Sequence, residues 1–264
     1  MSEHNLALFC DFENIALGVR DLRAKLDLKL VLERLLLKGS IVVKKAYCDW
    51  DRYKDFKAQM HGASFELIEI PHVRQSGKNS ADIRMVVDAL DLCYTKAHID
   101  TFVIISGDSD FSPLVSKLRE NAKTVIGVGV RASTSELLIG NCHEFIFYDD
   151  LIAEATSSEP QRRPRRGKRA GAAAPAASDA GLAAIRLVLD TAEAIYAERG
   201  DAAKLWASMV KQTLRRRRPE FSESAYGYRS FNELIEDAAQ RGLVDLARDE
   251  RSGGYVIQKI HAPK

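Results

Sequence analysis

The sequence predicts an α/β domain with a mostly parallel sheet, followed by a linker and a smaller, mainly helical domain. In the first part, short apolar runs rich in β-branched residues alternate with stretches of helical spacing, which is typical of a parallel sheet covered by helices on both faces. Residues 153–180 are rich in Pro, Ala and Arg and have no apolar periodicity. Residues 181–264 show helical patterns and then a hairpin signal. We therefore expect domains over 1–152 and 181–264, joined by a flexible basic linker over 153–180.

Short apolar runs in the first domain are predicted as strands. Their near-continuous hydrophobicity suits strands that are covered on both faces. They span residues 6–10, 41–48, 65–70, 102–106, 124–130 and 145–148. Residues 6–10 (LALFC) and 102–106 (FVIIS) are the most apolar runs, so we expect these two strands to be central and adjacent.

Helical spacing fills the intervals between most of these strands. The expected helices span residues 19–37, 51–61, 81–95 and 111–121. Parallel strands need crossover connections of this kind, so the helices should form the two outer layers of the domain.

The last part has a different pattern. An amphipathic helix is expected over 182–199 and a second over 201–214. Ser230 and Glu233 have the spacing of a capping box, which predicts the start of a third helix. A Gly-rich turn within 243–258 then indicates a β-hairpin. Three helices followed by a hairpin are typical of a winged helix.

Composition narrows the class of protein. The chain has 264 residues, 46% of them hydrophobic, and contains no apolar run of the roughly 18 residues that a membrane helix needs. The first residues lack the pattern of a secretory signal, so we expect a cytoplasmic protein without a membrane partner. Its four cysteines are far apart, which predicts reduced, buried thiols rather than a disulfide or zinc framework. They are Cys10, Cys48, Cys93 and Cys142.

Charge is divided unevenly along the chain. Residues 1–152 carry 19 Lys and Arg against 22 Asp and Glu, whereas residues 153–264 carry 20 against 15. The second part is therefore basic, which is compatible with binding a polyanion.

Polar residues follow the two strands that are expected to be central. Asp11 and Asn14 come after the first strand, and Asp108 and Asp110 come after residues 102–106. In open parallel sheets, ligands bind just outside the carboxyl ends of the strands. These side chains should therefore converge on one edge of the sheet. The alternative for Asp108 and Asp110 is a turn and cap before the next helix.

Asp82 is a further candidate because of its place on a predicted helix. It lies on the apolar stripe of that helix, which is formed by Met85, Val86, Ala89 and Cys93. A carboxylate facing the sheet is costly to bury unless something binds it. The alternative is an acid that the helix dipole favours at the helix start. Asp88 falls nearer the polar side and is expected to be solvated.

Clustered carboxylates repel one another, and a divalent cation removes the conflict. Mg²⁺ and Mn²⁺ prefer oxygen ligands, and such sites support hydrolysis at phosphorus. The sequence has no phosphate-binding loop of the G-x-x-x-x-G-K-[ST] type, no H-E-x-x-H and no G-x-S-x-G, which argues against P-loop, zinc-hydrolase and serine-hydrolase chemistry. A phosphatase that uses Asp11 and Glu13 fits the remaining residues less well.

Three motifs together resemble the NYN domain, in the LabA-like branch of the PIN-like nuclease superfamily. They begin at Asp11 (DFEN), Lys78 (KNSADIRMVVDAL) and Ser106 (SGDSDF). The resemblance covers about residues 5–152. It implies a three-layer α/β/α domain and ribonuclease activity that depends on Mg²⁺ or Mn²⁺.

The resemblance also assigns residues. The acidic metal-binding positions of the family are matched by Asp11, Asp82, Asp108 and Asp110. Asn14 matches an amide position, Lys78 a basic position that would steady charge at the scissile phosphate, and Asp88 a second acid on the helix. Many relatives have Ala-Asp before the last strand, whereas this chain has Glu144, which we leave out of the site.

The C-terminal part, about residues 181–260, resembles the OST-HTH (LOTUS) domain. The resemblance rests on the residues from Leu214 to Phe221 and from Tyr226 to Leu234, and on Gly242. It implies RNA binding and, in some members, protein partners. The phosphate-binding candidates are Lys211, Arg215, Arg216, Arg217 and Arg218, and the base-stacking candidates are Tyr226 and Tyr228. Alternatively, the arginines complement a helix dipole and the aromatic rings belong to a core.

These observations predict a metal-dependent endoribonuclease that carries an RNA-binding winged helix on a tether, which raises the local concentration of RNA. The main alternative is a non-catalytic RNA-binding adaptor that retains a nuclease-like fold. A phosphatase or small-nucleotide hydrolase is the other alternative.

Overall fold

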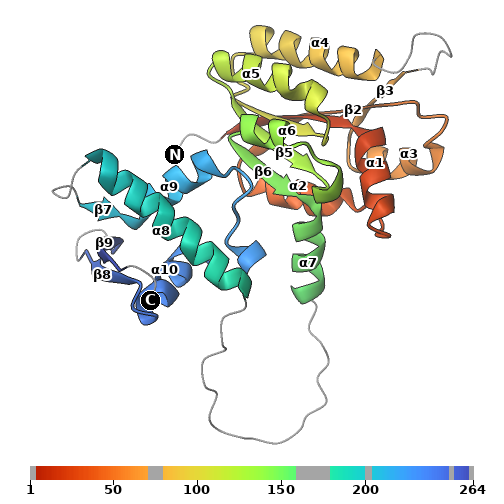
Figure 1. Cartoon of the computed structure of the whole chain (residues 1–264). Helices are drawn as coiled ribbons and strands as arrows, with labels where there is room; N and C mark the ends of the chain where they lie inside the picture. The colour runs from red at the N-terminus through yellow and green to blue at the C-terminus, as the bar shows by residue number, and fades with distance from the viewer. Residues whose placement is uncertain (1–3, 71–79, 159–178, 200–203, 250–252, 262–264) are drawn as a thin grey trace, which may run out of the picture. The chain divides into compact units, whose positions relative to one another are not determined.

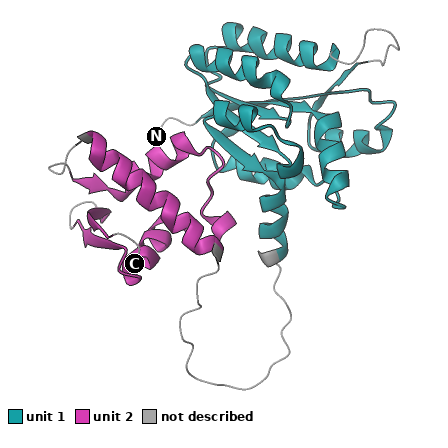
Figure 2. Cartoon of the chain, viewed as in Figure 1, with its two compact units in different colours: residues 1–156 teal, residues 157–264 magenta. Residues whose placement is uncertain are grey.

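The computed structural model describes residues 4–70, 80–158, 179–199, 204–249 and 253–261. The chain divides into two compact units, residues 1–156 and 157–264 (Figure 2). No helix in the described part of the chain is long and apolar enough to cross a membrane. The basic run of the predicted linker, residues 162–169, lies outside the described residues.

Unit 1 is built on a six-stranded parallel sheet of order β3-β2-β1-β4-β5-β6. The strands are β1 (Asn5–Asp11), β2 (Ser40–Cys48), β3 (Glu66–Glu69), β4 (Thr101–Ile105), β5 (Thr124–Gly129) and β6 (Glu144–Phe147). All of the predicted strands are present. β1 and β4 are central and adjacent, as predicted, and pair from Leu6 with Thr101 to Cys10 with Ile105.

Helices cover both faces of this sheet (Figure 1). They are α1 (Phe12–Asp21), α2 (Leu28–Leu36), η1 (Lys54–Phe56), α3 (Lys57–Gly62), α4 (Ser80–Thr95), η2 (Ser109–Phe111), α5 (Ser112–Glu120), η3 (Arg131–Ser133), α6 (Glu136–Asn141) and α7 (Tyr148–Ser158). Side chains alternate along β1, so Leu8 and Cys10 face a core with α1, α2, α3 and α7. Ala7 and Phe9 face the other core, with α4, α5 and α6. The predicted three-layer α/β/α architecture is confirmed.

Two of the predicted boundaries in unit 1 are wrong. The single helix expected over 19–37 is two helices, because the chain turns at Arg23, which has a positive φ of 55°, and Asp27 caps α2 by accepting from the amide of Lys29. The first residues of the expected linker, from residue 153, are helical, since α7 continues through Ser158.

Unit 2 contains helices and a three-stranded antiparallel sheet of order β7-β9-β8. Its elements are α8 (Asp179–Arg199), β7 (Leu205–Trp206), α9 (Ala207–Arg217), η4 (Ser224–Tyr226), α10 (Phe231–Gln240), β8 (Val244–Arg248) and β9 (Tyr255–Ile260). These helices and strands share a core of their own, which includes Val188, Val210 and Leu234.

The order of elements in unit 2 follows the prediction with one correction. The second helix does not continue back to residue 201, because Leu205 and Trp206 pair with β9 and α9 starts after them. At the start of α10, the Ser230 hydroxyl accepts from the amide of Glu233 at 3.2 Å, which confirms the predicted cap.

Candidate functional site

The carboxyl ends of β1 and β4 meet where the strand order reverses, and the predicted acids lie there. Asp11 ends β1 and caps α1 by accepting from the amide of Asn14 at 3.3 Å. Asp108 follows β4 and caps η2 by accepting from the amide of Asp110 at 2.9 Å. Both carboxylates serve as caps, which confirms the capping alternative, and they also lie at one edge of the sheet, as predicted.

A hydrogen-bond network joins the two strand ends. The Ser106 hydroxyl donates to Asp11 Oδ2 at 2.9 Å and accepts from the amide of Asp108 at 3.2 Å. The amide of Gly107 donates to Asn14 Oδ1 at 2.8 Å. Asn14 thus connects α1 to the segment that carries Asp108, which makes it a positioning residue of the site.

The loop after β5 packs tightly against this network. The amide of Ser135 donates to the carbonyl of Gly107 at 2.9 Å. A Cβ at Gly107 would lie 2.4 Å from the carbonyl oxygen of Ser133, so only glycine fits here. Sequence reasoning assigned no role to Ser106 or Gly107, although both are part of the SGDSD motif.

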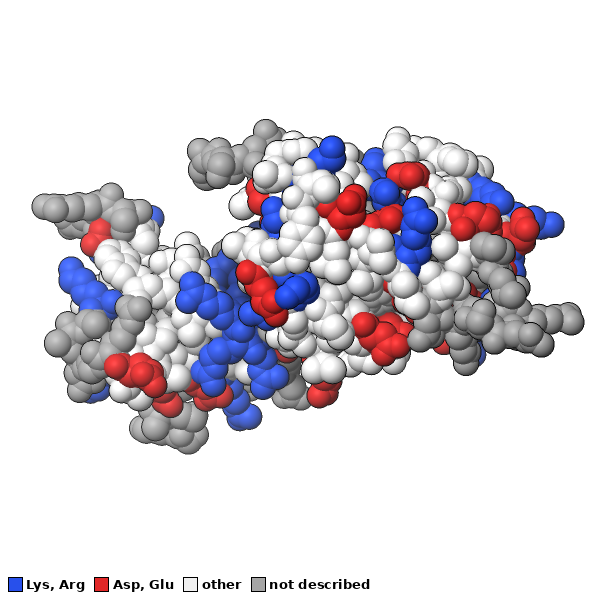
Figure 3. All heavy atoms as spheres, turned by 90° about the horizontal axis from the view of Figure 1, so that it is seen from above, with Lys and Arg blue, Asp and Glu red and all other residues white. Residues whose placement is uncertain are grey.

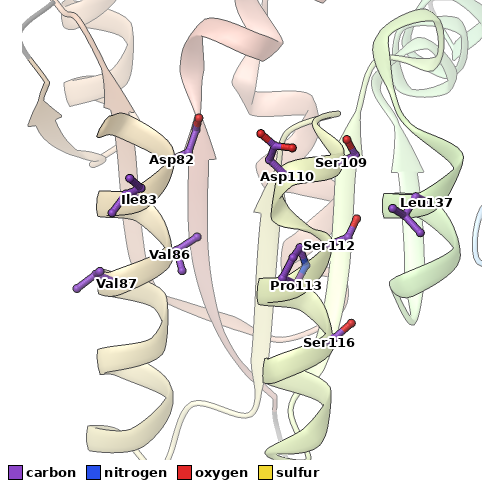
Figure 4. Close-up of a pocket in the computed structure, with 10 residues that line it drawn as sticks. All are labelled: Asp82, Ile83, Val86, Val87, Ser109, Asp110, Ser112, Pro113, Ser116 and Leu137. Atoms are coloured by element: carbon purple, nitrogen blue, oxygen red, sulfur yellow. The ribbon is translucent and has the colours of Figure 1, made fainter. Parts of the chain in front are cut away.

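Helix α4 brings Asp82 to the same region. Asp82 lies in the first turn, and the buried residues Met85, Ala89 and Cys93 follow on its side of the helix, as predicted. Figure 4 shows Asp82 on α4 and Asp110 on η2 at the same end of a cleft, from facing elements.

Charge accumulates in this site. The pKa of Asp11 is raised to about 7, mainly by burial and also by the charges of Asp82 and Asp108, while the hydrogen bonds from Ser106 and Asn14 offset only part of the rise. The pKa of Asp82 is also raised, by burial and then by the charges of Asp108 and Asp110. Mutual repulsion of this kind marks a site in which a cation would be stabilising.

The residues fit a hard divalent cation in chemistry, but the side chains are not preassembled around one. Among the described residues, no three His, Cys, Asp or Glu side chains are close enough together to hold a single ion. The expectation that Asp11, Asp82 and Asp108 already grip one ion is therefore not met by this side-chain arrangement. Their oxygen donors and their uncompensated negative charge remain those that Mg²⁺ and Mn²⁺ prefer.

Two other residues assigned by resemblance are not placed in this site. Lys78 lies outside the described residues. Asp88 accepts from the hydroxyl of Tyr47 at 2.9 Å and from Arg84 Nε at 3.0 Å, and it lies 3.4 Å from the ammonium of Lys45. The expectation that Asp88 is solvated is wrong, because Tyr47 and Lys45 on β2 and Arg84 on α4 contact its side chain, which is 12% exposed.

The basic candidates of unit 2 divide into two groups. Lys211 and Arg215 contact Glu223 at 2.8 and 3.6 Å. Burial tends to raise the pKa of Glu223, but these cations outweigh that effect and lower it. Arg216 and Arg217 are exposed at the end of α9. Figure 3 shows Lys and Arg side chains gathered in one dense patch on the face that it draws.

Arg218 and the two tyrosine candidates also have contacts within unit 2. Arg218 is exposed and lies 3.7 Å from a carboxylate oxygen of Glu220. The ring of Tyr226 stacks on Phe221 with centroids 5.6 Å apart. The hydroxyl of Tyr228 donates to Asp237 at 2.7 Å, and both tyrosines pack against the core of the unit. These contacts favour the core alternative for the two rings.

The fold and the site define a class: a three-layer α/β domain whose acidic site lies at the switch point of a parallel sheet. Residues 5–151 match the NYN domain model, and the chain belongs to the NYN domain family. This family is part of the PIN-like nuclease superfamily, whose domains generally use divalent metal ions.

Two relatives support this assignment. The uncharacterized protein MJ0482 of Methanocaldococcus jannaschii is 29% identical over 138 residues, which are 52% of each chain. The chain therefore spans about half the length of this curated relative. A crystal structure of a protein of unknown function, VPA0982 from Vibrio parahaemolyticus, is 25% identical with a TM-score of 0.50, and the match covers 56% of this chain and 95% of that one.

Proposed function

We propose that the protein is a metal-dependent endoribonuclease that hydrolyses RNA phosphodiester bonds with Mg²⁺ or Mn²⁺. The observation that carries the proposal is the electrostatic coupling of Asp11 to Asp82 and Asp108: burial raises the pKa of Asp11, and the charges of these two acids raise it as well. Together with membership of a nuclease superfamily, this supports a site that is completed by a cation and a phosphate. RNA is the proposed partner of unit 1.

In this proposal the four acids would hold the cation: Asp11, Asp82, Asp108 and Asp110. When bound, a divalent ion would supply activation of water and stabilisation of charge at phosphorus. The chain itself holds the acids in place. Ser106 restrains one oxygen of Asp11, the amide of Asn14 restrains the other, and Asn14 Oδ1 fixes the segment before Asp108. Lys78 is proposed to steady charge at the scissile phosphate.

We also propose that unit 2 is a winged helix of the OST-HTH type that binds RNA. The order of its helices and its antiparallel sheet support this proposal. Because Glu223 pairs with Lys211 and Arg215, Arg216 and Arg217 are the stronger candidates for phosphate contacts. A tethered second binding unit would add avidity to the nuclease unit.

The proposal is tested by incubating the full chain with labelled single-stranded RNA and DNA, in Mg²⁺, Mn²⁺ or EDTA. The variant Asp108→Asn should lose cleavage, whereas Asp51→Asn is a matched control, since its side chain is 95% exposed. We expect internal cleavage of RNA that EDTA abolishes. RNA binding without cleavage, unchanged by Asp108→Asn, would instead identify an adaptor, and turnover of a generic phosphomonoester would indicate a phosphatase.

A further inference from the structure

A cleft of about 710 Å³ opens beside the acidic site, on the outer side of α5 (Figure 4). Helices α4 and α6 flank it, and α5 forms its floor. The volume lies within the range of pockets that hold small molecules or parts of larger ligands. The chemistry of the lining therefore decides what it could bind.

The floor of the cleft consists of small side chains. Ser109, Ser112 and Ser116 lie three or four residues apart, so they share one side of the chain here, and together with Pro113 they line the cleft. The hydroxyl of Ser112 is buried and has no hydrogen-bond partner among the described residues, although buried hydroxyls are normally paired. The floor thus consists of small side chains, and Ser109 and Ser116, which are only partly buried, supply hydroxyl groups there.

The walls of the cleft are apolar and unusually exposed. Ile83 and Val87 on α4 are 62% and 55% exposed, and Leu137 on α6 is 60% exposed. Large apolar side chains that gather at a pocket and remain in water mark a surface that binds something. Their branched shapes suit contact with a flat apolar face.

The cleft is continuous with the candidate active site. Asp82 and Asp110 line the cleft, and both also belong to the proposed cation site. An RNA strand whose phosphate reaches these acids therefore has a neighbouring nucleoside at the mouth of the cleft.

We propose that this cleft binds one unpaired nucleobase next to the scissile phosphate, so that the protein selects RNA that is single-stranded at that point. The inference rests on the proposed nuclease function. A base would place its faces against the apolar walls and its polar edge on the serine hydroxyls, which is how pockets read an extruded base. A paired base cannot enter the cleft, because the partner strand already occupies its hydrogen-bonding edge. An apolar helix of a protein partner would offer no polar group to the hydroxyls of Ser109 and Ser116, which also line the cleft.

Cleavage of RNA oligonucleotides with one abasic nucleotide, moved stepwise along the strand, tests this inference. In the wild-type chain we expect cleavage to fall about tenfold when the abasic position neighbours the cleaved bond, because the contacts of that base with the cleft are lost. Leu137→Ala should cleave the intact RNA more slowly and lose this sensitivity. Leu36→Ala is the matched control, because Leu36 is 58% exposed and lies on α2, on the other side of the sheet.

Ultraviolet crosslinking in EDTA gives a readout that does not need turnover. RNA containing 4-thiouridine should crosslink to peptides from α4 or α6. Unlabelled single-stranded RNA should reduce this crosslink, whereas an unlabelled duplex should not. If intact RNA is never cleaved, the proposed function fails, and the position of the crosslink still decides this inference. A scan without any position dependence, or crosslinks elsewhere only, overturns it. The inference is also overturned if the protein is a dimer that Leu137→Asp dissociates while the abasic scan stays unchanged. The cleft would then be an interface between copies of the chain.

Discussion

The raised pKa of Asp11 makes a sharp prediction about the stability of the metal-free protein. The folded chain holds a proton on this carboxyl until about pH 7, whereas an unfolded chain releases it near 3.8. Between these values the folded state binds more protons, so the contribution of this group to stability falls as the pH rises through that window. Replacing the acid with its neutral isostere, Asp11→Asn, should therefore stabilise the protein above pH 7.

The size of the effect follows from the two pKa values. A rise from 3.8 to about 7 corresponds to at most about 4 kcal/mol, at about 1.4 kcal/mol for each pH unit. Asp11 keeps some exposure, so solvent screening reduces the expected gain to about 2 kcal/mol at pH 8. At pH 5 the gain should be less than half as large, because the wild-type carboxyl is then protonated in the folded chain. The Ser106 hydroxyl can accept as well as donate, so it can still pair with the amide of the variant.

Urea unfolding in EDTA at pH 5 and pH 8 measures this difference. Trp50 is fully buried in unit 1 and reports its unfolding by fluorescence, in a Trp206→Phe background that silences unit 2. Asp51→Asn should show no gain at either pH. Mn²⁺ at pH 8 should stabilise the wild type more than Asp11→Asn. If the variant is no more stable than the wild type at pH 8, or if its advantage is as large at pH 5, the assigned burial and repulsion at this carboxyl are wrong.

Three other predictions concern packing and binding. Gly107→Ala should cost about 1–3 kcal/mol in urea unfolding and lower RNA cleavage, because its Cβ meets the backbone of the loop after β5; Gly62→Ala, with open space around its Cβ, should not destabilise the protein and should leave cleavage unchanged. Tyr228→Phe should lower the stability of unit 2 by about 1 kcal/mol in calorimetry, since it removes a hydrogen bond to α10, and equal stability would show that this bond contributes nothing. Replacing Arg216 and Arg217 with Gln should reduce the slope of log affinity against log salt by about 1.4 for single-stranded RNA, and an unchanged slope would remove both residues from the interface.

Local pattern was enough to predict much of unit 1. The central strands β1 and β4 were predictable because each is a short apolar run that is buried on both faces. Their adjacency followed from their hydrophobicity, and it brought Asp11 and Asp108 to one edge. The position of Asp82 on the side of α4 that faces the sheet was predictable from its spacing to the buried residues of that helix. Each of these inferences uses the spacing of apolar residues, which can be read directly from the sequence.

Other features depended on partners that are distant in sequence. The start of α9 moved because β9 captures Leu205 and Trp206 as a strand. Lys211 and Arg215, two of the predicted phosphate contacts, pair with Glu223. No local pattern indicates such pairings, since they arise only when separate elements pack.

The amino-acid sequence by itself determined the layered α/β architecture, the family and the identities of the acidic residues, because hydrophobic periodicity and short motifs are local properties. Only the tertiary structure decided how these acids are held, through the hydroxyl of Ser106 and the close contact of Gly107 with the loop after β5. It also decided that an apolar cleft lies beside them, between α4 and α6. A cleft and a group of interacting charges are both formed by residues that are distant in sequence. The packing of the helices on the sheet decides which of these residues lie close together.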